Sequence, residues 1–96
     1  MIKVYLNSNF IIDSINQNLT GELTHVANID ILDLEKAFYL TQNLTDSWIK
    51  NKEIVPVINE LQRSISAGDV FEYADTFYFI DMIRFKEIEV DKSKIK

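Results

Sequence analysis

Two short runs of alternating apolar residues, separated by only two residues, constrain the fold more than any other feature of the sequence. Val70–Tyr73 and Thr76–Ile80 are rich in β-branched and aromatic residues. The Ala74-Asp75 pair between them is a candidate two-residue turn. Asp75 tolerates a positive φ angle well and Ala74 tolerates it poorly, so a slightly longer loop is the alternative. The pattern predicts an antiparallel β-hairpin in this part of the chain.

Three further segments have strand character. Residues 2–6 and 22–29 consist largely of β-forming residues and predict a first and a second strand. Residues 82–90 predict a last strand, in which the apolar alternation shifts phase by one residue, so we expect a bulge or bend near Lys86. Pro56 lacks a backbone N–H and cannot occupy a central strand. The segment around it is therefore either a short helix or an extended connection.

Helical patterns are present at two places. The apolar spacing predicts a helix over residues 32–44, in which the side chain of Asp30 or Asp33 accepts the free N–H groups of the first turn. The expected buried face of this helix consists of Leu34, Ala37, Phe38 and Thr41. Residues 10–19 are ambiguous, because the Asn-rich end favours a turn. If they are helical, the shared apolar face consists of Phe10, Ile11, Ile15 and Leu19. Trp48 is expected to fold back over the core.

Together these segments predict an α+β fold, a small and mostly antiparallel sheet of four to five strands with one or two helices packed on one face. The 96 residues fit one domain, which we place at residues 1–90, followed by a polar tail at 91–96 that is expected to fray. No run of apolar residues approaches the length of a membrane span, and the N-terminal apolar segment is too short for a signal peptide. We therefore expect a cytoplasmic protein.

Composition excludes most catalytic and cofactor-binding classes. The absence of cysteine removes disulfides, thiolate metal sites and cysteine nucleophiles together. His25 is the only histidine, and the spacing around it supplies neither an acidic partner nor a nucleophile, so we expect a surface residue or a hydrogen-bonded core residue. Two glycines are too few for a phosphate-cradling loop or a dinucleotide fingerprint. We expect a protein that is not an enzyme and binds no cofactor or metal ion.

Acidic residues outnumber basic ones, 15 to 10, which gives a net charge of −5. This balance argues against direct binding of nucleic acid and favours a partner with a basic surface. Residues 64–83 contain four acidic residues and no basic residue. By their position in or beside the predicted hairpin, the candidate partner-binding residues are Asp69, Glu72, Tyr73, Asp75 and Tyr78.

The loop before the hairpin, Arg63-Ser64-Ile65-Ser66-Ala67-Gly68-Asp69-Val70, is the most specific string in the chain. Gly68 can adopt a positive φ, and Asp69 can accept hydrogen bonds from N–H groups of the loop. The hydroxyl groups of Ser64 and Ser66 can close local turns. Arg63 is placed to pair with Asp69 across the loop. These five residues are therefore predicted to organise the loop.

With the segments around it, this string is similar to a group of small proteins from bacteriophages and mobile elements that share the signature RSxSxGDV. The similarity covers nearly the whole chain and includes the aromatic hairpin and the Phe85-Lys86-Glu87-Ile88 ending. Ala67 stands where valine is common in the group, and Arg84 stands where glycine is usual. The resemblance implies an origin in a phage genome and action inside a bacterial host, and it implies no particular activity.

Size, acidity and this resemblance predict a phage accessory protein that binds a host protein and inhibits or redirects it. The sharpest form of the hypothesis is a host protein with a basic surface that handles nucleic acid. The alternative is a structural or assembly domain that self-associates as a homodimer, through an exposed edge strand carrying Tyr73 or Tyr78.

Overall fold

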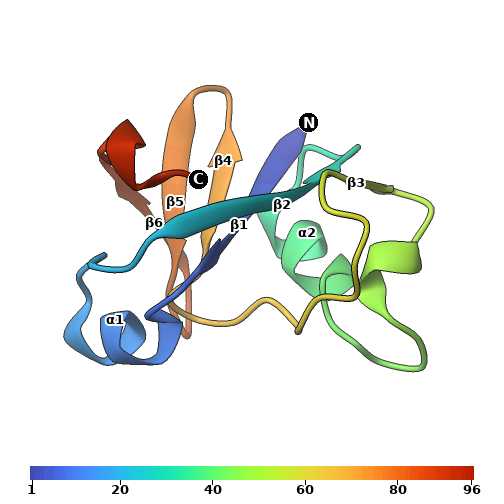
Figure 1. The fold of residues 1–96 in the computed structure, drawn as a ribbon, viewed down its shortest axis with the longest axis horizontal. Helices are drawn as coiled ribbons and strands as arrows, with labels where there is room; N and C mark the ends of the chain where they lie inside the picture. The colour runs from blue at the N-terminus through green and yellow to red at the C-terminus, as the bar shows by residue number, and fades with distance from the viewer.

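The computed structural model describes all 96 residues and contains one six-stranded antiparallel sheet with two short α-helices (Figure 1). The strands lie in the order β3-β2-β1-β4-β5-β6. They are β1 (Ile2–Asn7), β2 (Leu23–Ile29), β3 (Ile54–Pro56), β4 (Val70–Tyr73), β5 (Thr76–Ile80) and β6 (Phe85–Ile88). The helices are α1 (Phe10–Asn16) and α2 (Leu34–Leu40), with 3-10 turns η1 (Trp48–Lys50) and η2 (Lys92–Lys94). Neither α-helix has the length and apolar character needed to cross a membrane.

The α+β class is confirmed, and the predicted strand number of four to five is too low. The strand that the sequence did not predict is β3, three residues long, which pairs with β2 through Ile54, Val55 and Pro56. β3 lies at the edge of the sheet and has a neighbouring strand on one side only. Proline is tolerated in such a strand because its missing N–H is not needed to pair with a further strand. Of the two alternatives for the segment around Pro56, the extended one is present, and it forms a short edge strand.

Apolar side chains fill both faces of the sheet. On one face, Ile2, Val4 and Phe71 pack with Ala37 of α2 and with Trp48, which is fully buried as expected. On the other face, a smaller cluster forms around Tyr5, Leu23, Val70, Phe77 and Phe79. Figure 1 shows α2 and η1 together on the β2–β3 side of the molecule and α1 at the opposite end. One helix, α2, therefore packs on a face of the sheet, whereas α1 lies at its end.

The hairpin between β4 and β5 has the two-residue turn predicted from the sequence. Ala74 and Asp75 both adopt left-handed conformations, with φ angles of 52° and 65°, which is typical of the turn that matches the twist of paired strands. The longer loop is not present. Since Val70 pairs with Phe79 and Tyr73 with Thr76 in regular register, the hairpin is continuous from one end to the other.

The predicted last strand begins too early, and of the bulge or bend expected near Lys86 the structure has a bend, at residues 82–84, and no bulge. β6 pairs with β5 in regular register from Phe85 to Ile88. Residues 81–84 form a tight turn, in which the Asp81 N–H donates to the Arg84 carbonyl oxygen at 2.9 Å. The phase shift in the sequence therefore marks the end of a turn, and the irregular register lies elsewhere, between Val4 and Tyr5 in the pairing of β1 with β2.

Helix α2 is shorter than the predicted helix of residues 32–44. Asp33 is its N-cap, because its carboxylate accepts the N–H groups of Glu35 and Lys36. The helix ends at Thr41, whose hydroxyl donates back to the carbonyl oxygens of Ala37 and Phe38. Ala37 and Thr41 are fully buried, so the predicted face does point into the core.

The C-terminal residues 91–96, expected to fray, are docked onto the sheet. Asp91 accepts a hydrogen bond from the Ser93 N–H and caps η2, and this contact lowers the pKa of its carboxyl below the ordinary value. Ile95 forms a parallel bridge with Leu23, and the Lys96 N–H donates to the Leu23 carbonyl oxygen at 2.8 Å. Ile95 of this segment packs against the smaller apolar cluster.

Candidate protein-binding surface

Helix α1 buries one residue, which is polar, and turns three of its apolar residues outward. Asp13 is its one buried residue and is fully buried, whereas Ile11, Ile12 and Ile15 are 62%, 58% and 76% exposed. A helix on a globular protein normally buries its apolar side. The apolar face expected for residues 10–19 is therefore present, but Ile11 and Ile15 on it are directed to solvent and not to the core.

A dense set of hydrogen bonds holds Asp13 in place. Its Oδ2 accepts from Asn7 Nδ2 at 2.8 Å, from the Thr20 N–H at 2.8 Å and from the Gly21 N–H at 3.0 Å, and its Oδ1 accepts from Thr20 Oγ1 at 2.5 Å. Burial raises the pKa of the Asp13 carboxyl, but the hydrogen bonds from Asn7, Thr20 and Gly21 outweigh it and lower the pKa below its ordinary value. The carboxylate thus fixes α1 against the ends of β1 and β2.

Asn7 extends this network to the loop before β4. Its side-chain amide also donates to the Gly68 carbonyl oxygen at 2.8 Å, and its backbone N–H donates to Asp69 Oδ1 at 2.8 Å. Arg63 forms two hydrogen bonds to the Asp69 carboxylate, at 2.7 and 2.8 Å, and its guanidinium lies 3.6 Å above the ring of Phe10. The loop and the start of α1 are therefore one connected unit.

The remaining loop residues act mainly through local hydrogen bonds. Gly68 has a φ of +96°, in the region that favours glycine. Ser64 Oγ accepts the Asn43 N–H at 2.7 Å, which ties the loop to the end of α2. Ser66 contributes its backbone N–H, which donates to Asp69 Oδ2 at 2.9 Å, in place of the hydroxyl contact expected from the sequence.

The structure does not bring the predicted partner-binding residues together as one surface. Asp69 is fully buried beneath Arg63 and is not accessible to a partner. Glu72 accepts a hydrogen bond from the Tyr5 hydroxyl at 2.6 Å, on the face of the sheet opposite to Tyr73 and Tyr78. Asp75 is exposed in the hairpin turn. The acidic hairpin is therefore divided among a buried site, two faces and a turn.

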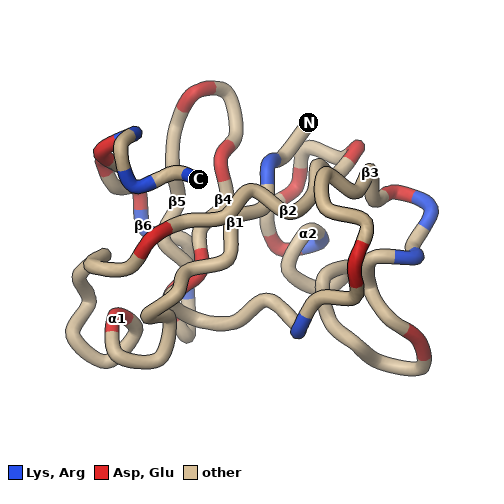
Figure 2. The backbone as a smooth tube through the Cα atoms, viewed as in Figure 1, with Lys and Arg blue, Asp and Glu red and all other residues tan.

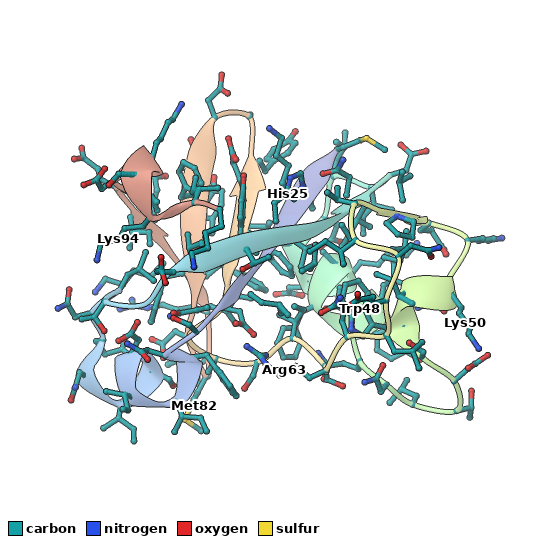
Figure 3. All side chains as sticks on the ribbon, viewed as in Figure 1. His25, Trp48, Lys50, Arg63, Met82 and Lys94 are labelled. Atoms are coloured by element: carbon teal, nitrogen blue, oxygen red, sulfur yellow. The ribbon has the colours of Figure 1, made fainter.

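Apolar residues form a more continuous candidate surface. In the turn between β5 and β6, Met82 and Ile83 are 86% and 90% exposed, and Figure 3 shows Met82 beside α1. A groove of about 670 Å³ lies between this turn and α2, and a smaller one of about 280 Å³ lies between the turn and α1. Ala67 and Met82 line both grooves, so the two grooves adjoin each other. We call the combined area the apolar surface; its main side chains are Ile11, Ile15, Leu34, Phe38, Met82 and Ile83.

The part of the apolar surface that lies between the turn and α1 has no charged side chain in its lining. Apart from the buried Asp13, α1 carries no charged residue, as Figure 2 shows. The charged side chains of the surface are in the lining of the larger groove, which includes Glu35 and the pair formed by Asp81 and Arg84, whose charged atoms are 3.9 Å apart. A mainly apolar area with few charged side chains is the usual composition of the core of a protein–protein interface.

The residues that could carry other chemistry are engaged in structural contacts. His25 Nε2 lies 2.7 Å from Asn28 Oδ1, and its ring packs 5.1 Å from that of Tyr5. Burial, followed by the hydrogen bond to Glu72 and its negative charge, raises the pKa of Tyr5 well above the ordinary value. No group of three or more His, Asp and Glu side chains is arranged so that it could hold a metal ion.

Sequence reasoning assigned a binding role to none of the main residues of this surface, among them Ile11, Ile15, Met82 and Ile83. One signal was present, since Asp13 interrupts the apolar run Phe10-Ile11-Ile12-Asp13-Ser14-Ile15 at the centre of a single helical turn. A helix this short cannot bury both the carboxylate and the isoleucines that flank it. The side chain with the most hydrogen-bond partners was the one that became buried.

Comparison with known proteins adds no family assignment to this geometry. No family model matches the chain, and no match was found among the curated proteins or the solved structures.

Proposed function

We propose that the protein acts by binding another protein and that the apolar surface forms the centre of the contact. The observation that carries this proposal is that α1 turns its polar side to the protein and its apolar side to solvent. It buries Asp13 and exposes Ile11 and Ile15 beside Met82. Contiguous exposed apolar patches on small proteins mark interaction sites. Methionine and aromatic side chains, such as Met82 and Phe38 here, are enriched in the cores of such interfaces.

The partner that we propose is a protein of the bacterial host, located in the host cytoplasm. Binding would inhibit or redirect this host protein. The phage resemblance is the basis for the host, and the exposed apolar surface is the basis for binding without chemistry on the partner. The net charge of −5, with Glu35 in the lining of the larger groove, favours a partner that carries basic residues around its contact area. The protein need not imitate nucleic acid to bind such a partner.

Self-association is the competing function. The strand order does not favour self-association through an edge strand that carries Tyr73 or Tyr78. Tyr73 and Tyr78 belong to β4 and β5, which are interior strands, so neither residue lies on an open edge of the sheet. A second copy could still cover the apolar surface. Light scattering over a wide range of protein concentration separates the two cases, and we expect a monomer throughout.

Charged substitutions on the apolar surface test the proposed function. Met82 is 86% exposed and Ile15 is 76% exposed, so Met82→Glu and Ile15→Glu are expected to leave the fold intact. A charge placed at the centre of a desolvated contact weakens binding by about 2 kcal/mol or more, roughly 30-fold in Kd. Proteins captured from bacterial lysate by the wild-type chain are identified and purified, and the Kd of each is then measured against the variants.

Val57→Glu is the matched control for these substitutions. Val57 is 51% exposed, just beyond β3 at the other edge of the sheet, so its replacement introduces the same charge outside the apolar surface. We expect the Kd of this variant to equal that of the wild type. Equal binding by all three variants would place the contact elsewhere and contradict the proposal.

A further inference from the structure

We propose that the bound segment of the partner is extended and adds to β6 as a seventh strand, with an apolar side chain directed to the groove beside α2 and a basic side chain at the far end of β6. This inference rests on the proposed function, because it specifies how the partner is bound. It is carried by two observations, the unpaired backbone of β6 and the different character of the surface at its two ends.

The outer edge of β6 has backbone donors and acceptors without partners. The Ile80 N–H donates to the Asp69 carbonyl oxygen at 2.9 Å, and the Ile80 carbonyl oxygen accepts from the Gly68 N–H at 2.8 Å, just before β4. Ile80 therefore cannot bond Phe85, its partner in β6, and along an antiparallel pair such positions alternate. Phe85 and Glu87 consequently direct their N–H and C=O groups away from β5. Neither residue makes any other hydrogen bond, so the edge is available to an added strand.

The two ends of β6 select different side chains. At its start, Phe85 lines the groove of about 670 Å³ together with Leu34, Phe38 and other apolar side chains. At its end, a shallow recess of about 470 Å³ is lined by Asp75, Glu87 and Glu89, with no basic side chain. Alternate residues of a strand share one face. A segment with an apolar residue and a basic residue two positions apart, opposite Phe85 and Glu87, would match both ends.

A second copy of the chain fits this edge poorly. Two identical strands pair about a two-fold axis perpendicular to the sheet, and each antiparallel register is then centred on one residue. The four registers centred within β6 place Arg84 opposite Lys86, Lys86 opposite Lys86, Glu87 opposite Glu87, or Glu87 opposite Glu89. Like charges directly opposite each other destabilise a pair of strands. The edge therefore favours a different chain over its own copy.

The probe for this inference is a displayed library of random peptides about twelve residues long, selected on the immobilised full chain. We expect the enriched peptides to share an apolar residue and a Lys or Arg two positions apart. One enriched peptide is then synthesised, and its Kd is measured by fluorescence polarisation. In the bound wild-type protein, hydrogen exchange at the amides of Phe85 and Glu87 is expected to slow at least about 10-fold.

Glu87→Pro and Glu87→Ala form a matched pair of variants. The Glu87 N–H is directed outward and serves no bond within the sheet, so proline removes a donor that only an added strand would use. Alanine removes the same side chain and keeps this donor. We expect proline to raise the Kd of the peptide at least about 10-fold beyond the effect of alanine.

The outcomes separate this inference from the proposed function. Equal Kd values for the two Glu87 variants, with unchanged exchange at Phe85 and Glu87, would overturn strand addition, and so would a selection without enriched peptides of the expected pattern. If peptide binding is lost in Met82→Glu but not in Glu87→Pro, the apolar surface binds the peptide without strand addition, and only the proposed function stands. The exchange measurement uses the wild-type chain, so the test does not depend on how well the proline variant folds.

Discussion

Replacing Asp13 with alanine is expected to lower the free energy of unfolding by about 3–4 kcal/mol, a large part of the roughly 5–15 kcal/mol that stabilises a typical domain. The Asp13 carboxylate is fully buried and accepts hydrogen bonds from Asn7, Thr20 and Gly21. Alanine leaves these donors without their acceptor in a site that is closed to solvent, and each unsatisfied buried donor costs on the order of 1–3 kcal/mol. Urea unfolding followed by circular dichroism measures the loss.

Asp33→Ala is the control for this prediction. Asp33 also accepts two backbone N–H groups, but it is exposed at the start of α2, so water can replace the lost acceptor. Loss of an exposed N-cap costs about 1 kcal/mol. If Asp13→Ala proved no more destabilising than Asp33→Ala, the network around Asp13 would not be what holds α1 in its orientation.

Replacing Gly68 with alanine is the second substitution with a large expected effect, a loss of about 3 kcal/mol or more. Gly68 has a φ of +96°, and a Cβ atom at this position would lie 2.0 Å from the backbone carbonyl oxygen of Phe10. Relief of this overlap requires that the loop and the start of α1 move apart. That movement disrupts the hydrogen bonds of Asn7 to Gly68 and Asp69. Thermal and urea unfolding both report the change.

Ala74→Gly is the matched control, with the opposite expected sign. Ala74 has a φ of 52° in the exposed hairpin turn, where glycine relieves backbone strain without any change in packing. We expect this variant to be more stable than the wild type by about 0.5–1 kcal/mol. A wild-type stability for Gly68→Ala would show that the loop and α1 are not packed as closely as described.

Local signals in the sequence predicted those parts of the fold that depend on neighbouring residues. The turn at Ala74-Asp75 and the cap at Asp33 were both readable, because the residues that determine them are a few positions apart. The pairing of Arg63 with Asp69 was anticipated for the same reason, since both residues lie in one loop. The phase shift near Lys86 left a bulge or a bend open, because both produce the same alternation, and the structure has the bend at residues 82–84.

Features that depend on distant residues could not be predicted. The order of the strands places β1 between β2 and β4, and this order makes β4 and β5 interior strands, so the tyrosines expected at an edge are not there. Asp13 is buried because donors from Asn7, Thr20 and Gly21 converge on it in space. Nothing in the sequence indicates that these residues lie close together, and the pattern of isoleucines beside Asp13 is that of ordinary core residues.

The claim on which the binding hypothesis depends is that α1 exposes its isoleucines in the free protein. Nuclear magnetic resonance of isoleucine methyl groups, in the presence of a soluble paramagnetic agent, tests this claim directly. We predict strong relaxation enhancement at Ile11, Ile15 and Ile83, and little at the buried Ile2 and Ile29. If the methyl groups of Ile11 and Ile15 were as protected as those of Ile2 and Ile29, α1 would be turned inward or covered by a second copy, and the account would be contradicted.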